Sequence, residues 1–105
     1  MLRRVTTISL ILLFGLAAGP LFAAADGAAI YKAKCAMCHG ANGSGDTPMG
    51  KSLKVRDLRS DPVQKQTDIE LTKIIAGGKG KMPPQKITTE EVAAVIAFIR
   101  TLKAK

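Results

Sequence analysis

The sequence contains one histidine, two cysteines, one tyrosine and no tryptophan in 105 residues. A structural zinc site needs four ligands, and Cys35, Cys38 and His39 are the only cysteines and the only histidine. No segment shows the alternation of apolar and polar residues that a half-buried strand requires. These absences exclude a structural zinc site built from cysteine and histidine, and they favour an all-α fold.

Aromatic residues are scarce, and they are not interleaved among the lysines, so nucleic acid is not an expected partner. Residues 26–105 keep only Tyr31 and Phe98 as aromatics. A domain of this size is marginal if an apolar core alone must stabilise it. A large planar cofactor would supply the missing core.

The two cysteines and the histidine lie together in the pentapeptide Cys35-Ala36-Met37-Cys38-His39. This spacing is typical of covalent haem attachment, in which each thiol adds to one vinyl group and the adjacent histidine ligates the iron. A redox-active dithiol pair or a plain disulfide is the alternative, but a dithiol pair should follow a strand and none is predicted here. The motif therefore predicts one covalently attached haem c, held by Cys35 and Cys38, with His39 as a metal ligand.

The first 25 residues have the organisation of a secretory signal peptide. Arg3 and Arg4 form the basic region, residues 5–18 form the apolar region, and residues 23–25 are the small residues of a cleavage site. We expect cleavage before Asp26, export to the periplasm, and a single soluble domain over residues 26–105. The alternative is an uncleaved membrane anchor, because the apolar run nearly reaches the length of a bilayer span.

The charge of the domain indicates the kind of partner. Without Arg3 and Arg4, 14 basic residues stand against 8 acidic ones, a formal net charge of +6. Such a domain is steered toward acidic surfaces, and its association rate falls as salt rises. The alternative is a lysine surface that is merely solvated.

Three helical patterns are separated by loops rich in glycine and proline. Asp26 can cap a first helix that ends around His39, with an apolar side formed by three residues: Ala29, Ile30 and Ala33. The first helix therefore carries the attachment motif at its end.

The other two helices begin with capping boxes. Thr67 and Glu70 open a helix that ends at residues 77–78, and Thr88 and Glu91 open one that runs to about Leu102. The inward-facing residues are predicted to be Leu71, Ile74 and Ile75 in one helix, and Val92, Val95, Ile96 and Ile99 in the other.

With one histidine present, a second axial ligand must come from another residue type, and Met82 is the predicted donor. Met1 leaves with the signal peptide, Met37 lies inside the attachment motif, and Met49 is expected on the same side of the iron as His39. Met82 stands between a glycine-rich approach and two prolines, an arrangement that can carry and fix a side chain. Ordinary core packing is the alternative role for Met82.

These residues resemble the small monohaem class I cytochromes c of bacteria, and the resemblance covers residues 26–105. It implies an all-α fold of about three to four short helices around the haem. In that family, a glycine and an aromatic residue precede the first haem cysteine at the spacing of Gly27, Tyr31 and Cys35. The resemblance implies a close crossing of the terminal helices, with Tyr31 against Phe98.

The resemblance also implies two contacts around the haem. The backbone carbonyl of Pro48 would accept a hydrogen bond from the His39 ring and orient it. Because the chain has no tryptophan, a haem propionate would be held by another residue, with Lys54, Arg56 and Arg59 as candidates.

Ligation by both His39 and Met82 leaves no open position on the iron, so we expect a soluble one-electron carrier with no catalytic residues, and no enzyme. The alternatives are a haem subunit of a larger respiratory complex, or a haem peroxidase or sensor if Met82 is labile. We expect a monomer that meets redox partners through their acidic docking surfaces. The lysines expected near the haem edge are Lys32, Lys34, Lys79, Lys81 and Lys86.

Overall fold

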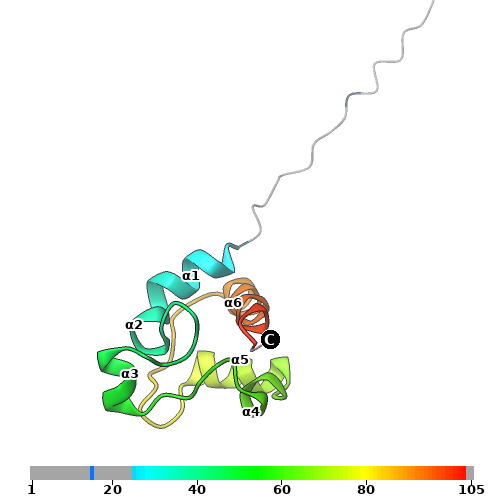
Figure 1. Ribbon diagram of the computed structural model, residues 1–105. Coiled ribbons are helices and arrows are strands. Elements are labelled where there is room, and N and C mark those ends of the chain that lie inside the picture. Colours follow the sequence, from blue (N-terminus) through cyan, green and yellow to red (C-terminus); the bar gives the residue numbers. More distant parts are fainter. Residues whose placement is uncertain (1–14, 16–24, 104–105) are drawn as a thin grey trace, which may run out of the picture.

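The computed structural model of the chain describes Gly15 and residues 25–103. Within this part the fold is all-α, as predicted, and no extended strand is present. The helices, shown in Figure 1, are α1 (Gly27–Lys34), α2 (Ala36–His39), α3 (Pro48–Leu53), α4 (Asp61–Gln64), α5 (Asp68–Gly77) and α6 (Thr89–Thr101). None of the helices in residues 25–103 combines the length and the apolar character needed to cross a bilayer. The predicted signal peptide lies almost wholly outside the described residues and stays a prediction.

The first predicted helix is two helices in the structure. Asp26 caps α1 as expected, and its Oδ1 accepts a hydrogen bond from the Ala29 amide at 3.1 Å. The helix is interrupted at Cys35, which closes α1 and opens α2. The Tyr31 hydroxyl donates to the carbonyl of Gly40 at 2.6 Å, which holds the end of α2 against α1. This bond joins residues nine positions apart across the break at Cys35, and a continuous straight helix would place the two groups too far apart.

The buried side of α1 also differs from the prediction. Ala29 and Ala33 are exposed, Ile30 is half-buried, and Tyr31 is the buried residue of the helix, at 1% exposure. The periodicity of small alanines is a weak signal, because an alanine loses little free energy when it stays in water.

The two later helices agree with the sequence. Thr67 accepts from the Glu70 amide and Thr88 from the Glu91 amide, and both glutamates bond back to the cap residue, so each capping box is complete. The four inward-facing residues predicted in α6 are all buried. In α5, Leu71 and Ile75 are buried and Ile74 is half-buried. Local capping and periodicity were therefore sufficient to predict both helices.

The terminal helices cross closely at Gly27. A Cβ on this residue would overlap the carbonyl oxygen of Ala94 in α6 and lie 2.6 Å from its carbonyl carbon. Four residues further along α1, Tyr31 packs on Phe98 with ring centroids 4.9 Å apart and the rings tilted by 51°. Both contacts confirm the crossing that the family resemblance implied.

Helices α3 and α4 were not predicted. Thr47 caps α3 by accepting from the Gly50 amide at 2.9 Å, and Pro48 occupies the first turn. Helix α4 begins after Ser60 and has Pro62 in its first turn. Proline at the first or second helical position is a helix-start signal, but both helices are too short to show an apolar period.

Arg100 fastens the segment between α4 and α5 to the last turn of α6. Its guanidinium donates to the carbonyls of Gln64 and Gln66 at 2.8 and 2.6 Å, and it pairs with Asp68 at 2.8 Å. The Gln64 amide group donates in turn to the carbonyl of Ile99 at 3.0 Å. The bonds from Arg100 give partners to the carbonyls of Gln64 and Gln66, which keeps this segment in one position against α6.

The buried phenol of Tyr31 predicts a loss of stability at high pH. Burial, with a smaller contribution from Cys35, raises the pKa of Tyr31 from 10.0 to about 12. The folded state therefore favours the neutral phenol. Its contribution to stability is complete below pH 10.0 and disappears as pH rises through about 12.

We expect Tyr31→Phe to lower the free energy of unfolding at neutral pH by about 1 kcal/mol, because the hydrogen bond to Gly40 is lost. The variant should also lose stability less steeply than the wild type between pH 10 and 12. Denaturant unfolding at a series of pH values measures both effects. Parallel stability curves for the two proteins would contradict the assignment.

Candidate functional site

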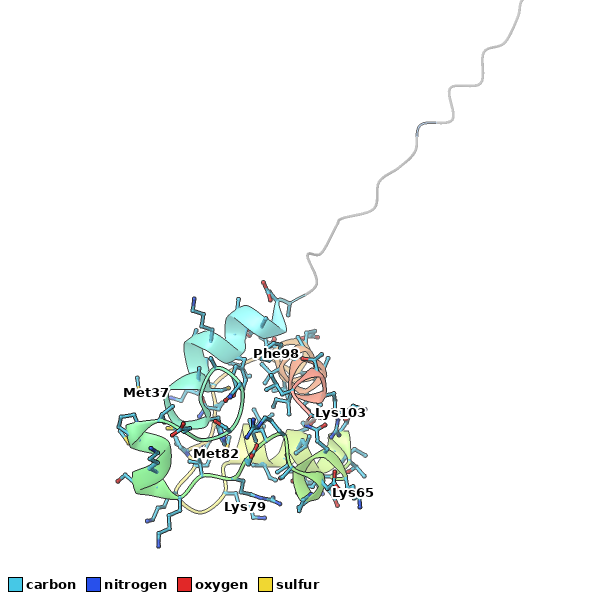
Figure 2. All side chains as sticks on the ribbon, viewed as in Figure 1. Met37, Lys65, Lys79, Met82, Phe98 and Lys103 are labelled. Carbon is cyan, nitrogen blue, oxygen red and sulfur yellow. The ribbon has the colours of Figure 1, made fainter. Side chains whose placement is uncertain are left out.

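One cavity of about 460 Å³ lies among the helices, and it brings together the two cysteines, the histidine and the methionine that the sequence predicted to hold the haem. Cys35, Cys38 and His39 reach it from the junction of α1 and α2, and Met82 reaches it from the loop after α5. Figure 2 shows Met82 and Lys79 on this loop, in the part of the molecule between α3 and α5. Residues more than forty positions apart in the chain therefore share one cavity.

The two thiols are free and half-buried. Burial raises the pKa of the Cys35 thiol, and the neighbouring Cys38 raises it further. The carbonyl of Cys38 accepts a hydrogen bond from the Thr47 hydroxyl at 2.9 Å. The cap residue of α3 is therefore bonded to the backbone of the attachment motif. Both cysteines line the cavity, and neither forms a disulfide.

His39 has a buried nitrogen with no hydrogen-bond partner. Its Nδ1 atom is the one buried side-chain nitrogen or oxygen of the described residues that lacks a partner. Burial lowers the pKa of His39, and a backbone group of Arg56 partly offsets this. A lowered pKa favours the neutral imidazole, which is the form that ligates a metal.

The predicted hydrogen bond from His39 to the carbonyl of Pro48 is wrong for this structure. Nδ1 has no partner, and Pro48 instead forms the first turn of α3. The backbone group that influences the ring belongs to Arg56, in the extended segment after α3. The separation between His39 and Pro48 in the sequence was suitable for this hydrogen bond, but Thr47 caps α3 and Pro48 is the first residue of that helix.

Met82 is the methionine best placed to act inside the cavity. Its side chain is half-buried and lines the cavity. Met37 also touches the cavity but is 75% exposed, and Met49 is 46% exposed and lies outside the lining. This distribution agrees with the reasoning that set Met82 apart from Met37 and Met49.

The rim of the cavity carries charge of one sign. Its lining includes no aspartate or glutamate and five basic residues, namely Lys34, Lys54, Arg56, Lys79 and Lys81. Lys32 and Lys86, which were expected near the same edge, do not line the cavity. Lysines 34, 79 and 81 are therefore placed as expected, while Lys54 and Arg56 complete the set.

Two of the three candidates for a haem propionate face the cavity. Lys54 and Arg56 line it, and Arg59 does not, because Arg59 is engaged in a salt bridge with Asp57 at 3.0 Å. Arg56 donates to the side chain of Gln66 at 3.1 Å, and Gln66 also lines the cavity. No signal in the sequence indicated that Gln66 lines the cavity and bonds Arg56, because its position depends on the hydrogen bond from Arg100 to its carbonyl.

The residues of the cavity fit a covalently attached haem. Two free thiols and an imidazole with an orphaned nitrogen stand at one wall, and a thioether lies in the same space. The remaining wall is mainly aliphatic, with Leu53, Val63, Leu71, Ile74, Ile75, Val95 and Ile99. An apolar cavity of this volume with a few convergent polar groups is the usual form of a cofactor site.

Comparison with known proteins agrees with this chemistry. The family model for cytochrome C oxidase, cbb3-type, subunit III matches residues 22–99. The chain belongs to this family of c-type cytochromes. As a c-type cytochrome it carries covalently attached haem c, which contains iron.

Solved structures of c-type cytochromes have the same fold. The structure of KustC0563 c-type cytochrome is 32% identical, with a TM-score of 0.69, and the match covers 75% of this chain and 99% of that chain. A point mutant of Kustc0563 is also 32% identical, with a TM-score of 0.66 and coverage of 74% and 99%. No curated protein matched the chain. The all-α fold is thus the class I cytochrome c fold.

Removal of the thiols tests the mode of haem attachment in this cytochrome. Cys35→Ala and Cys38→Ala each leave one thiol able to form a thioether, and the double variant leaves none. We expect acid-acetone to extract no haem from the wild type and all of it from the double variant, measured by visible absorbance of the supernatant and the precipitate.

Met37→Leu is the matched control, because Met37 stands between the two cysteines and its side chain is 75% exposed. Its haem should stay with the precipitated polypeptide. Haem released from the wild type by acid-acetone would refute attachment through Cys35 and Cys38.

Proposed function

We propose that this cytochrome is a diffusing one-electron carrier of the periplasm, with haem c bound through Cys35 and Cys38 and ligated by His39 and Met82. When bound, haem c supplies exchange of a single electron between ferric and ferrous iron. The observation that carries the proposal is the convergence of both thiols, the imidazole and the thioether of Met82 on a single cavity.

Each of the four residues has a distinct part. The thiols would fix the cofactor in place and in orientation, and they lie at the cavity wall at the break between α1 and α2. His39 offers a neutral nitrogen, which its burial favours. Met82 offers a soft sulfur, which favours the ferrous state and raises the reduction potential relative to a second nitrogen ligand.

Ligation of the iron by both His39 and Met82 would argue for a carrier and against an enzyme. A substrate, oxygen or peroxide would have to displace the Met82 side chain, which is half-buried within the cavity. A ligand set that does not change with oxidation state also keeps the reorganisation of the protein small, which suits fast electron exchange.

The basic rim supports a partner with an acidic docking surface. The five basic residues of the cavity lining meet no acidic side chain there, so the charge that the protein itself places at the cavity has one sign, and Lys54 and Arg56 would face the anionic haem propionates. An acidic partner would be drawn to the part of the surface nearest the cofactor. The domain would act as a monomer that binds such partners briefly.

A fixed haem subunit of a larger respiratory complex is the second candidate, and the family match favours it. The matching family model is described as subunit III of a cbb3-type cytochrome c oxidase. The chemistry at the cavity would be the same, and only the lifetime of the contact with the partner would differ. Copurification of the cytochrome with a larger complex from detergent extracts would favour this candidate over a diffusing carrier.

Replacement of Met82 tests the sulfur ligand. The oxidised wild type should show the weak absorbance band at the red end of the visible spectrum that marks sulfur bound to ferric haem. Met82→Ala should lose this band and lower the midpoint potential by on the order of 0.1 V, as loss of a thioether ligand predicts. Met49→Leu, outside the cavity, should keep both properties. Retention of the band in Met82→Ala would refute the ligand assignment.

Small charged oxidants test the field of the basic rim. We expect the rate of oxidation of the reduced protein by anionic ferricyanide to fall as salt rises, and the rate with cationic cobalt complexes to rise. Lys79→Gln and Lys81→Gln should each reduce the ferricyanide rate at low salt by about twofold.

Lys73→Gln is the matched control, because Lys73 is exposed on α5 and does not line the cavity. Its ferricyanide rate should stay close to that of the wild type. Equal slowing by all three lysine replacements would assign the effect to net charge, and would contradict a docking role for the rim. Stopped-flow absorbance measures these rates.

A further inference from the structure

The loop that carries Met82 is closed by a backbone clasp, which we define as residues 79–82. The amide of Lys79 donates to the carbonyl of Met82 at 3.0 Å, and the amide of Met82 donates to the carbonyl of Lys79 at 3.0 Å. This reciprocal pair is an isolated antiparallel bridge around a turn of two residues, Gly80 and Lys81. Both backbone hydrogen-bonding groups of Met82 are therefore used within the clasp.

Both ends of the loop are tied to the last turn of α5. The Gly78 amide donates to the carbonyl of Ile74 at 2.8 Å, and the Gln85 amide donates to the carbonyl of Ile75 at 2.9 Å. Between these two ties the clasp is the hydrogen-bonded element that holds the backbone of Met82. The Met82 side chain is half-buried in the cavity, while Lys79, Gly80 and Lys81 are exposed.

The clasp depends on the backbone conformation of Gly80. Its φ is +58°, in the left-handed region, and a Cβ at this position would meet no atom within 4 Å. Glycine is required there by conformation and not by space. Because Gly80 has positive φ and Lys81 does not, the turn has the pattern of a tight hairpin turn with glycine at its first central position.

We propose that the clasp sets how firmly Met82 holds its axial position, and that Gly80 is the positioning residue through which the clasp acts. The inference rests on the proposed ligation by Met82 and deepens it. An opened clasp releases the backbone of residues 79–82, and an external ligand then competes for the position that Met82 leaves. Any change that disfavours the closed clasp raises the apparent affinity of that ligand by the same factor.

Three glycine replacements separate conformation from other effects. The closed clasp requires positive φ at residue 80, and the open loop does not. Gly80→Ala places an L-residue with a Cβ in this conformation, which disfavours the closed clasp. Gly80→Asn is the conservative rescue, because asparagine tolerates positive φ better than alanine does. Gly77→Ala is the matched control in the same loop region, because Gly77 has no positive φ and a Cβ there would also meet nothing within 4 Å.

The probe is imidazole, titrated into the oxidised holoprotein and followed by the shift of the Soret band. We expect Gly80→Ala to bind imidazole about five- to thirtyfold more tightly than the wild type, and Gly80→Asn to fall between them. Gly77→Ala should match the wild type. Amide hydrogen exchange at Lys79 and Met82 should speed up in the same order, and guanidinium unfolding of the whole protein shows whether global stability has changed.

Wild-type imidazole affinity in Gly80→Ala, or an equal rise in Gly77→Ala, would overturn the inference. A rise that follows only the loss of global stability would overturn it as well, because the clasp would then be a structural element without a specific effect on Met82. The Met82→Ala variant distinguishes failure of the proposed ligation from failure of the clasp alone. If Met82→Ala binds imidazole no more tightly than the wild type, Met82 is not the ligand, and both proposals fall together.

Discussion

The close crossing of α1 and α6 determines where the functional groups of this cytochrome lie. At Gly27 the two backbones approach so closely that a Cβ would overlap the carbonyl of Ala94. The rest of α1 then runs along α6, and Tyr31 packs on Phe98 while its hydroxyl holds the carbonyl of Gly40. The attachment motif lies between Tyr31 and Gly40, so this one crossing directs both thiols and the imidazole to the cavity.

The hydrophobic core and the cofactor site share their walls. Six of the buried apolar residues also line the cavity, namely Tyr31, Val63, Leu71, Ile75, Val95 and Ile99. A domain of this size buries too little apolar surface to be robust by itself. Contacts between these side chains and a bound porphyrin would therefore contribute to folding as well as to function, and would link the stability of the protein to its cofactor.

Local signals in the sequence predicted helices α5 and α6, because the caps at Thr67 and Thr88 and the apolar periods after them act within a few residues. They could not predict the break at Cys35, since the bond between Tyr31 and the carbonyl of Gly40 is a tertiary contact. The same division holds at the site. The motif and the composition were enough to select the residues that converge on the cavity, Met82 included. The surroundings of His39 were not predictable, because the caps and turns between α2 and α4 decide which carbonyl lies near its ring.

The one-sign rim of the cavity has a consequence for encounters between two copies of this cytochrome. Two molecules that met at their rims would bring like charges together with no acidic residue in either lining to offset them. Under the proposed function, electron self-exchange between two copies would be slower than exchange with an acidic surface. The same charge that would draw the cytochrome to an acidic partner would also keep two copies apart at their rims, so electrons would pass mainly to the partner.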